Sequence, residues 1–248
     1  MPASKSKDNA RVEHTARAFT RRLLALQDDE ELRKIQRYFK SGEGEYAHGD
    51  KFIGVRMGSI FALAKEFADM PIAEIETLLD NDIHESRVGA LSIMAKQYPL
   101  KTTADDGRKA LYDLYLRRHD RINNWDLVDL AAWHVIGPWL VDKPRAVLHK
   151  LAKSKNMWER RTAILATFSF IKRGEFDDTL KIARLLIKDD QDLSHKAAGW
   201  ALRVVGDKDR EVLNAFLDEH AAQMPRAMLS NAIEKFTPAD KVRYRAMT

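Results

Sequence analysis

Apolar residues recur at spacings of three and four along nearly the whole chain. No segment shows the sustained alternation of apolar and polar residues that is typical of a half-buried strand. Spacings of three and four place the apolar side chains on one face of a helix, so the sequence predicts an all-α fold. We expect helices at residues 9–26, 29–40, 56–69, 71–80, 84–98, 105–118, 124–136, 143–153, 156–172, 175–188, 192–205, 207–220, 223–234 and 237–246.

Four of these segments begin alike when they are aligned, and their starts lie about 35 to 40 residues apart. They are HESRVGALSIMA from residue 84, NWDLVDLAAWHV from 124, MWERRTAILATF from 157 and LSHKAAGWALRV from 193. Such a period is typical of repeated pairs of antiparallel helices, in which each pair buries its apolar face against the next. We therefore expect a curved solenoid with a concave surface. Residues 1–248 should form a single domain, with residues 1–8 as a flexible leader.

The connections between the expected helices are short, except for residues 41–54. Glycine and proline stand together in the segment IGPW, residues 136 to 139. This pair predicts that one helix stops there and another starts.

The composition excludes several kinds of site. The chain has no cysteine, which rules out disulfides, thiolate zinc sites and a cysteine nucleophile. The sequence contains neither a metal-ligand spacing of histidines nor a glycine-rich phosphate loop. We therefore expect no metal and no cofactor. Four histidines are expected to be surface or packing residues: His84, His134, His149 and His195.

The sequence has no apolar run of 18 residues and no apolar stretch behind its basic first residues. We therefore expect a cytoplasmic protein. The net charge of +5 is compatible with a polyanionic partner.

Cations recur on or beside the apolar faces, near the starts of the repeated helices: Arg87, Arg161, Lys196 and Arg203. A helix start is already electropositive, so a cation there needs a further reason. One explanation is an internal carboxylate partner such as Glu85 or Asp126. The other is an external anion, because cations aligned along a concave face would follow a phosphate backbone. The sequence leaves both explanations open.

Trp125 and Asp129 lie four residues apart in NNWDLVDLAAWHVIG, at the edge of an apolar helix face, so both side chains can reach the same object. Trp200 has a similar position two repeats later. Either tryptophan could also be an ordinary core residue at a helix contact. Asp129 could complement the helix dipole after an Asn124 cap. Periodicity alone does not decide between a site and a core.

The segments NNWDLVD, WERRTAIL, HKAAGWALR and KFIGVRMGSIFALAKEF, the last at residues 51–67, together resemble the AlkD family of DNA alkylation-repair glycosylases. The similarity runs from about residue 30 to about residue 235. It implies a HEAT-like helical-repeat fold and a monomeric DNA glycosylase. Such an enzyme releases positively charged N3- and N7-alkylated purines from duplex DNA without flipping the base.

The resemblance also implies roles for matched residues. Asp129 would be the catalytic carboxylate, and Trp125 and Trp200 would pack on the backbone and sugar of the lesion. Arg161 would contact a DNA phosphate. The residues expected to bind DNA are Arg161, Arg203, Lys196, Tyr46 and Arg56. Where many relatives have proline or threonine after the GV turn, this chain has Arg56, Met57 and Gly58.

The chemistry of alkylated purines fits these residue types. A purine methylated at N7 or N3 is a cation, so the base leaves neutral without protonation and the sugar develops positive charge instead. A fixed carboxylate stabilises that charge chiefly in the transition state, and Asp129 could also orient the attacking water. Indole faces stabilise a nearby cation and exclude water. No lysine within the motifs is placed to form a Schiff base, so we expect base release without strand cleavage.

Two other functions remain open from the sequence. The chain could be a catalytically inactive relative that binds bent or branched DNA. It could also be a protein–protein adaptor, which predicts a concave face rich in exposed apolar residues.

Overall fold

The computed structural model describes residues 13–247, and all helices and turns below lie in that range. The first repeats contain α1 (Ala16–Leu24), α2 (Asp29–Tyr38), α3 (Met57–Glu66), α4 (Ile72–Leu79), α5 (His84–Gln97) and α6 (Asp105–Arg117). The middle contains α7 (Trp125–Ala131), α8 (Gly137–Trp139), α9 (Ala146–Leu151), α10 (Met157–Ala166) and α11 (Phe168–Ile171). The last helices are α12 (Asp177–Leu186), α13 (Asp192–Lys208), α14 (Arg210–His220), α15 (Arg226–Ala232) and α16 (Pro238–Arg245).

Within residues 13–247 the chain forms no β-strand, and an isolated bridge joins Lys51 to Ile83. The all-α prediction is therefore confirmed, and every predicted helix has a counterpart at its expected place. The predicted leader, residues 1–8, lies outside the described residues. No helix in the described part of the chain is long and apolar enough to cross a membrane.

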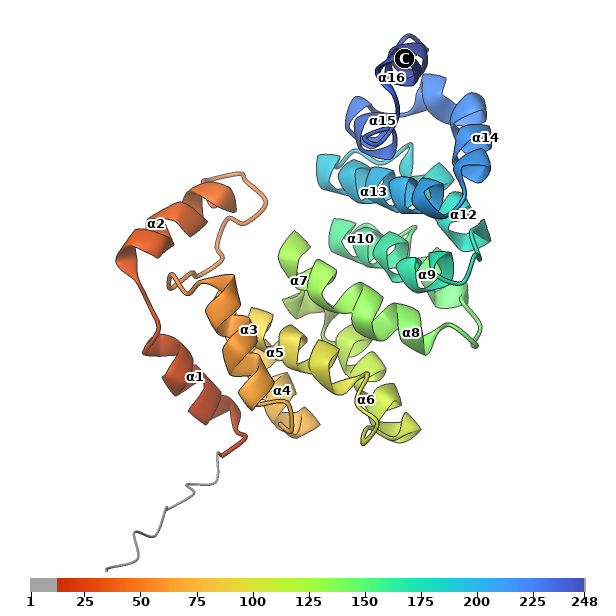
Figure 1. The fold of residues 1–248 in the computed structure, drawn as a ribbon. Helices are drawn as coiled ribbons and strands as arrows, with labels where there is room; N and C mark the ends of the chain where they lie inside the picture. The colour runs from red at the N-terminus through yellow and green to blue at the C-terminus, as the bar shows by residue number, and fades with distance from the viewer. Residues whose placement is uncertain (1–12, 248) are drawn as a thin grey trace, which may run out of the picture.

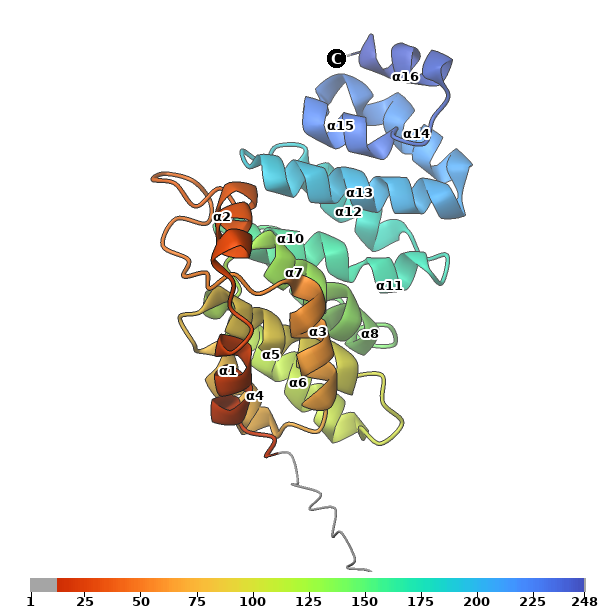
Figure 2. The ribbon, with the colours of Figure 1, turned by 60° about the vertical axis from the view of Figure 1, so that its left-hand side comes forward.

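The helices stack on one another in chain order along a curve, so that α2 and α13 lie on opposite arms of the molecule (Figure 1). A view turned by 60° shows the same order from α1 to α16 (Figure 2). Buried side chains from Ala16 to Tyr244 form one continuous hydrophobic core through the stack. The curve is the shape expected when each helix pair buries its face against the next.

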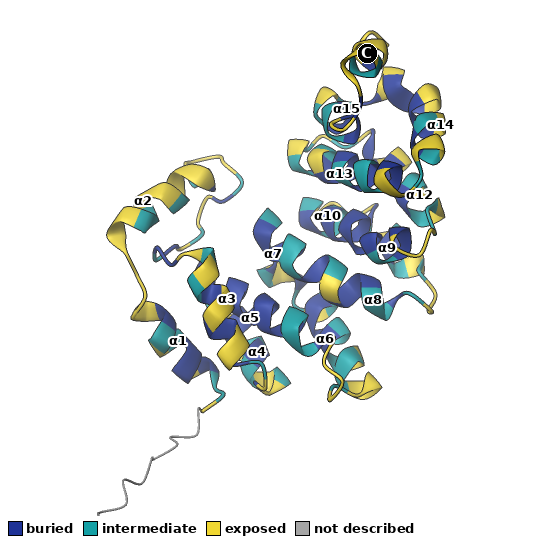
Figure 3. Cartoon of the chain, in the orientation of Figure 1, coloured by how far each residue is buried: buried dark blue, intermediate teal, exposed yellow. Residues whose placement is uncertain are grey.

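Burial differs sharply between α5 and α2 (Figure 3). Residues His84 to Met94 of α5 are all buried, because α3, α4 and α7 pack around this helix. In contrast, α2 has no buried residue. Its N-terminus is capped by Asp28, whose side chain accepts a hydrogen bond from the backbone N–H of Glu31. Thus α2 is a locally capped helix on the margin of the stack.

The IGPW segment does not break the helix, so this prediction was wrong. Residues Ala132–Ile136 form a π-helical turn that joins α7 directly to α8. The N–H of Gly137 bonds to the carbonyl of Ala132, five residues back. The wider turn accommodates Pro138, which has no N–H and whose ring would clash with the carbonyl four residues back in a regular helix.

Candidate functional site

Two tryptophans and an aspartate follow one another at intervals of about one helical turn along α7 and the π turn after it: Trp125, Asp129 and Trp133. Each of them is only partly buried. The Asn124 side chain caps this helix by accepting a hydrogen bond from the N–H of Trp125 at 2.8 Å. The cap fixes where the helix starts, and so fixes which face carries the three side chains.

Asp129 forms a two-pronged ion pair with Arg161 of α10. Arg161 Nε and Nη2 donate to the two carboxylate oxygens at 2.8 and 2.9 Å. Arg161 Nη1 donates to the carbonyl of Leu193 at 2.8 Å, so the guanidinium joins α7, α10 and the start of α13. The Arg161 side chain is 7% exposed and that of Asp129 is 20% exposed. The carboxylate is therefore fixed in place and still reachable from outside.

The pKa of Asp129 is shifted upward. Burial raises it, and the charge and hydrogen bonds of Arg161 only partly oppose this effect. Asp126, one turn before it on the same helix, raises it further. The group is thus held in surroundings that make its negative charge costly, which is common for carboxylates that act in catalysis.

Trp125 packs against side chains from the N-terminal segment. Its indole stacks on the ring of Phe39, with centroids 5.3 Å apart and an angle of 12° between the planes. Tyr38 meets it edge-on at 5.8 Å. The indole Nε1–H donates to the hydroxyl of Tyr46 at 3.2 Å. Two predicted site residues, Trp125 and Tyr46, are therefore in direct contact.

Trp200 lies in a second aromatic cluster, together with Trp133 and Phe168. Its ring is edge-on to Trp133 at 5.4 Å and to Phe168 at 5.0 Å. Trp200 therefore contacts the tryptophan that lies one turn after Asp129. Trp133 was not predicted from the sequence, although its spacing from Asp129 matches that of Trp125.

The cations on the helix faces all have internal carboxylate partners. Arg87 Nη2 binds Asp50 at 2.7 Å and Lys196 Nζ binds Asp192 at 2.6 Å. Arg203 pairs with Glu234. Of the two explanations left open by the sequence, the structure therefore shows the internal partner for all of these side chains, Arg161 included.

The partners suggested from the sequence were wrong. Asp126 binds His84 at 2.8 Å instead of an arginine. Glu85 accepts hydrogen bonds from the backbone N–H groups of Ile53, Gly54 and Val55, at 2.9 to 3.4 Å. Gly54 has φ of +80°, a conformation that favours glycine, so this carboxylate stabilises a tight turn.

The exposed pairs are different in kind from the buried ones. Lys196 is 51% exposed, and Arg56, which binds Glu31 at 3.0 Å, is 72% exposed. Ion pairs of this kind contribute little to stability and exchange readily with other anions. Both side chains are therefore accessible at the surface.

A cleft of about 450 Å³ lies beside Trp125, between α2, α3 and α5. Its walls are mostly apolar and aromatic, and include Ile35, Tyr38 and Phe52. Tyr38, one of its lining residues, is 67% exposed. In residues 13–247, no group of three or more histidine, cysteine, aspartate or glutamate side chains is placed to hold a metal ion.

Comparison with known proteins assigns the chain to a family. A family model described as DNA alkylation repair enzyme matches residues 19–236. A solved structure described as a predicted DNA alkylation repair enzyme from Enterococcus faecalis has a TM-score of 0.66 and 16% sequence identity, which shows a shared fold. The alignment covers 86% of this chain and 97% of that one. A comparison with curated proteins finds no match. The family predicted from the sequence motifs is thus confirmed, and the chain belongs to the DNA alkylation repair enzyme family.

Proposed function

We propose that this protein is a monofunctional DNA glycosylase that hydrolyses the N-glycosidic bond of cationic N3- and N7-alkylated purines in duplex DNA. The observation that carries the proposal is the setting of Asp129. It is a partly exposed carboxylate, locked by Arg161, on a helix face that carries an indole one turn to each side.

The reaction needs a negative group beside the sugar and does not need an acid. The alkylated base is already a cation and departs neutral, so positive charge grows on the deoxyribose as the bond breaks. Asp129 would stabilise that charge. The hydrogen bonds from Arg161 occupy one lone pair on each carboxylate oxygen of Asp129. The remaining lone pairs can bind the attacking water.

The two aromatic clusters would contact the nucleotide on either side of the carboxylate. Indole faces stabilise a nearby cation by about 0.5 to 2 kcal/mol each and keep bulk water away. Trp125, Trp200 and Trp133 are partly exposed, as such contacts require. We further propose that Lys196, Arg203 and Arg56 bind the phosphate backbone, and that the base remains stacked instead of entering a pocket.

The substitution Asp129→Asn tests the assignment because it keeps the shape and removes the charge. We expect it to lower the single-turnover rate of 7-methylguanine release by at least about 100-fold while duplex affinity changes little. Asp113→Asn is the control, since Asp113 is a 43% exposed acid on α6 that pairs with Lys109. The control should release base at the wild-type rate.

Three outcomes would refute the proposal in different ways. Unchanged release by Asp129→Asn would show that the carboxylate is not catalytic. Tight duplex binding by the wild-type protein without release from any alkylated substrate would favour the inactive DNA-binding function. Weak binding that does not respond to salt would favour a protein–protein adaptor.

A further inference from the structure

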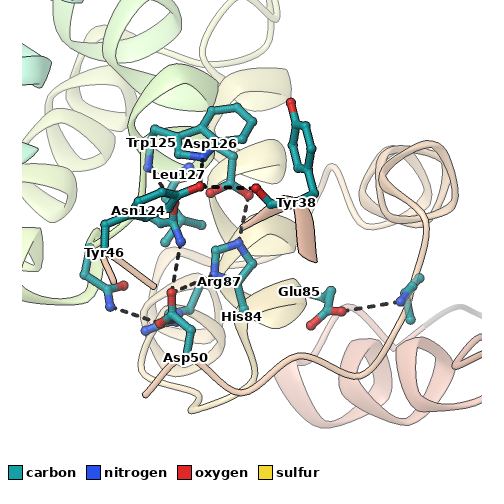
Figure 4. A network of polar contacts seen from close by, with 12 residues as sticks. Tyr38, Tyr46, Asp50, His84, Glu85, Arg87, Asn124, Trp125, Asp126 and Leu127 are labelled. Atoms are coloured by element: carbon teal, nitrogen blue, oxygen red, sulfur yellow. Dashed lines mark hydrogen bonds and ion pairs between the residues drawn. The ribbon is translucent and has the colours of Figure 1, made fainter. Parts of the chain in front are cut away.

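Four buried charged side chains lie together beneath the start of α7 (Figure 4). They are Asp50, His84, Arg87 and Asp126, and we call them the charged hub. Their side chains are only 2% to 5% exposed. Asp50 belongs to the long 41–54 connection, His84 and Arg87 to α5, and Asp126 to α7. The hub thus joins three separate parts of the chain.

Asp50 is the centre of the hub. It accepts hydrogen bonds from Arg87 Nη2 at 2.7 Å and from the side-chain amides of Asn123 and Asn124 at 3.0 Å. His84 stands between the two carboxylates, with Nε2 2.8 Å from Asp126 and Nδ1 3.6 Å from Asp50. Two cations and two anions are therefore buried together without net charge.

The protonation states follow from these contacts. Burial lowers the pKa of His84, but the carboxylates of Asp126 and Asp50 outweigh burial and raise it to about 9. Burial likewise opposes ionisation of Asp50, yet the hydrogen bond from Asn124 and the charges of His84 and Arg87 hold the pKa of Asp50 well below its usual range. His84 and Asp50 are thus both charged at neutral pH.

A buried ion cluster is an expensive way to stabilise a fold, because apolar residues of similar volume often serve as well. Ionic groups do more than apolar ones in fixing one geometry, since each bond has a required distance and direction. The geometry that the hub fixes is the position of the 41–54 connection relative to the first turn of α7.

Trp125 is linked to the hub through its backbone and to the 41–54 connection through its ring. Asn124, held by Asp50, accepts the hydrogen bond from the backbone N–H of Trp125. Tyr46, four residues before Asp50, accepts the hydrogen bond from the indole. Displacement of the 41–54 connection would therefore release the indole and loosen the helix cap together.

We propose that Asp50 and His84 are positioning residues of this enzyme, which act on the reaction by holding Trp125 and Tyr46 in the arrangement that meets the nucleotide. The proposal rests on the glycosylase function proposed above. It differs from a general role in stability because its effect must pass through Trp125.

The first test measures position without activity. The indole N–H signals of the five tryptophans can be followed by ¹H–¹⁵N NMR, with Trp125 assigned by its loss in Trp125→Phe. We expect Asp50→Asn and His84→Gln to shift the Trp125 signal and leave that of Trp139 in place, since Trp139 packs on Tyr112. His220→Gln is the control, because His220 is a buried histidine on α14. An unmoved Trp125 signal in both variants would overturn the proposal.

The second test is a double-mutant cycle on the single-turnover rate of base release. We expect His84→Gln to lower the rate about tenfold in the wild-type background and less than about twofold in the Trp125→Ala background. Duplex affinity should change little in either case. Equal loss in both backgrounds would show that His84 does not act through Trp125.

The two tests separate the two proposals. If the wild-type protein releases no base, the glycosylase function fails, whereas the NMR result still decides whether the hub positions Trp125. If His84→Gln does not fold, the isosteric Asp50→Asn replaces it in both experiments.

Discussion

At the scale of single residues, the decisive contact is the one between Asp129 and Arg161. The arginine orients the carboxylate through two parallel hydrogen bonds, the strong geometry for such a pair. It also partly cancels the charge that the reaction needs. A DNA phosphate near α10 would compete with Asp129 for the guanidinium, and the carboxylate would then face the sugar with more of its charge.

Arg161→Ala should move the acid limb of the rate–pH profile to higher pH. Arg161 lowers the pKa of Asp129, so its removal lets burial raise that pKa further. The carboxylate would then be protonated, and the rate lost, at a higher pH than in the wild type. Single-turnover release measured from about pH 4 to about pH 8, a range that starts at the ordinary aspartate pKa and extends above it, shows at which pH the rate is lost.

Arg160→Ala is the matched control. Arg160 is the neighbouring residue on α10, is 13% exposed and pairs with Asp189 instead of Asp129. Both variants break a largely buried ion pair, which costs about 3 to 5 kcal/mol of stability. Only Arg161→Ala should move the limb, and an equal shift in both variants would contradict the account.

The sequence could identify Trp125 and Asp129 as a pair, because their spacing is a property of one helix. It could not identify the partner of Arg161, which depends on how α10 stacks on α7, 32 residues away along the chain. Asp50 was missed for a related reason. It lies in an irregular connection without periodicity, and its contacts with His84 and Arg87 span 34 and 37 residues. His84, expected to be a surface or packing residue, is therefore part of a buried charged cluster.

At the scale of helices, close packing between neighbours depends on glycine. A Cβ atom added to Gly199 of α13 would lie 2.3 Å from the backbone carbonyl oxygen of Met228 in α15. The carbonyl cannot move without shifting its helix. At Gly58 of α3, an added Cβ would meet nothing within 4 Å.

These two glycines predict opposite effects of alanine. Gly199→Ala should destabilise the protein by at least about 1 to 3 kcal/mol, the usual cost of overpacking. Gly58→Ala should stabilise it by up to about 1 kcal/mol, because alanine is the better helix former. Urea unfolding gives both free energies. A stable Gly199→Ala variant would show that α13 and α15 are not in close contact in solution.

The periodicity of apolar residues predicted which segments of residues 13–247 are helical. It did not predict how one helix connects to the next. The Gly–Pro pair at 137–138 is an ordinary helix-breaking signal, and here a π turn overrides it. The reason lies in the tertiary packing of α8. A Cβ on Gly137 would lie 2.3 Å from the carbonyl oxygen of Ala166, so α8 must continue in close contact with α10.

At the scale of the whole molecule, the charged hub ties the N-terminal helices to the remainder of the stack. The contribution of the hub to the stability of the protein should depend on pH through His84. The pKa of His84 is about 9 in the folded protein, above its ordinary value of 6.5. The stabilisation is therefore complete below pH 6.5 and is lost as the pH rises through 9.

The raised pKa of His84 predicts that the free energy of unfolding depends on pH differently in the wild type and in His84→Gln. The free energy of unfolding of the wild type should fall between pH 7 and pH 10 by roughly 2 to 3 kcal/mol more than that of His84→Gln. The comparison removes the contribution of lysines and tyrosines, which titrate in both proteins. Urea unfolding at each pH measures the difference, and parallel curves would show that His84 is not held in its charged form.

Removal of cationic purines through Asp129 is the activity proposed for this curved helical protein. Its most direct measurement is release from a duplex that carries one N7-methylguanine, incubated with the wild-type protein in the presence of EDTA. Chromatography of the free base and electrophoresis of the strand follow the reaction. We expect stoichiometric release of 7-methylguanine, with a strand that stays uncut and breaks only after alkali. A duplex that binds the protein and keeps its methylated base would contradict it.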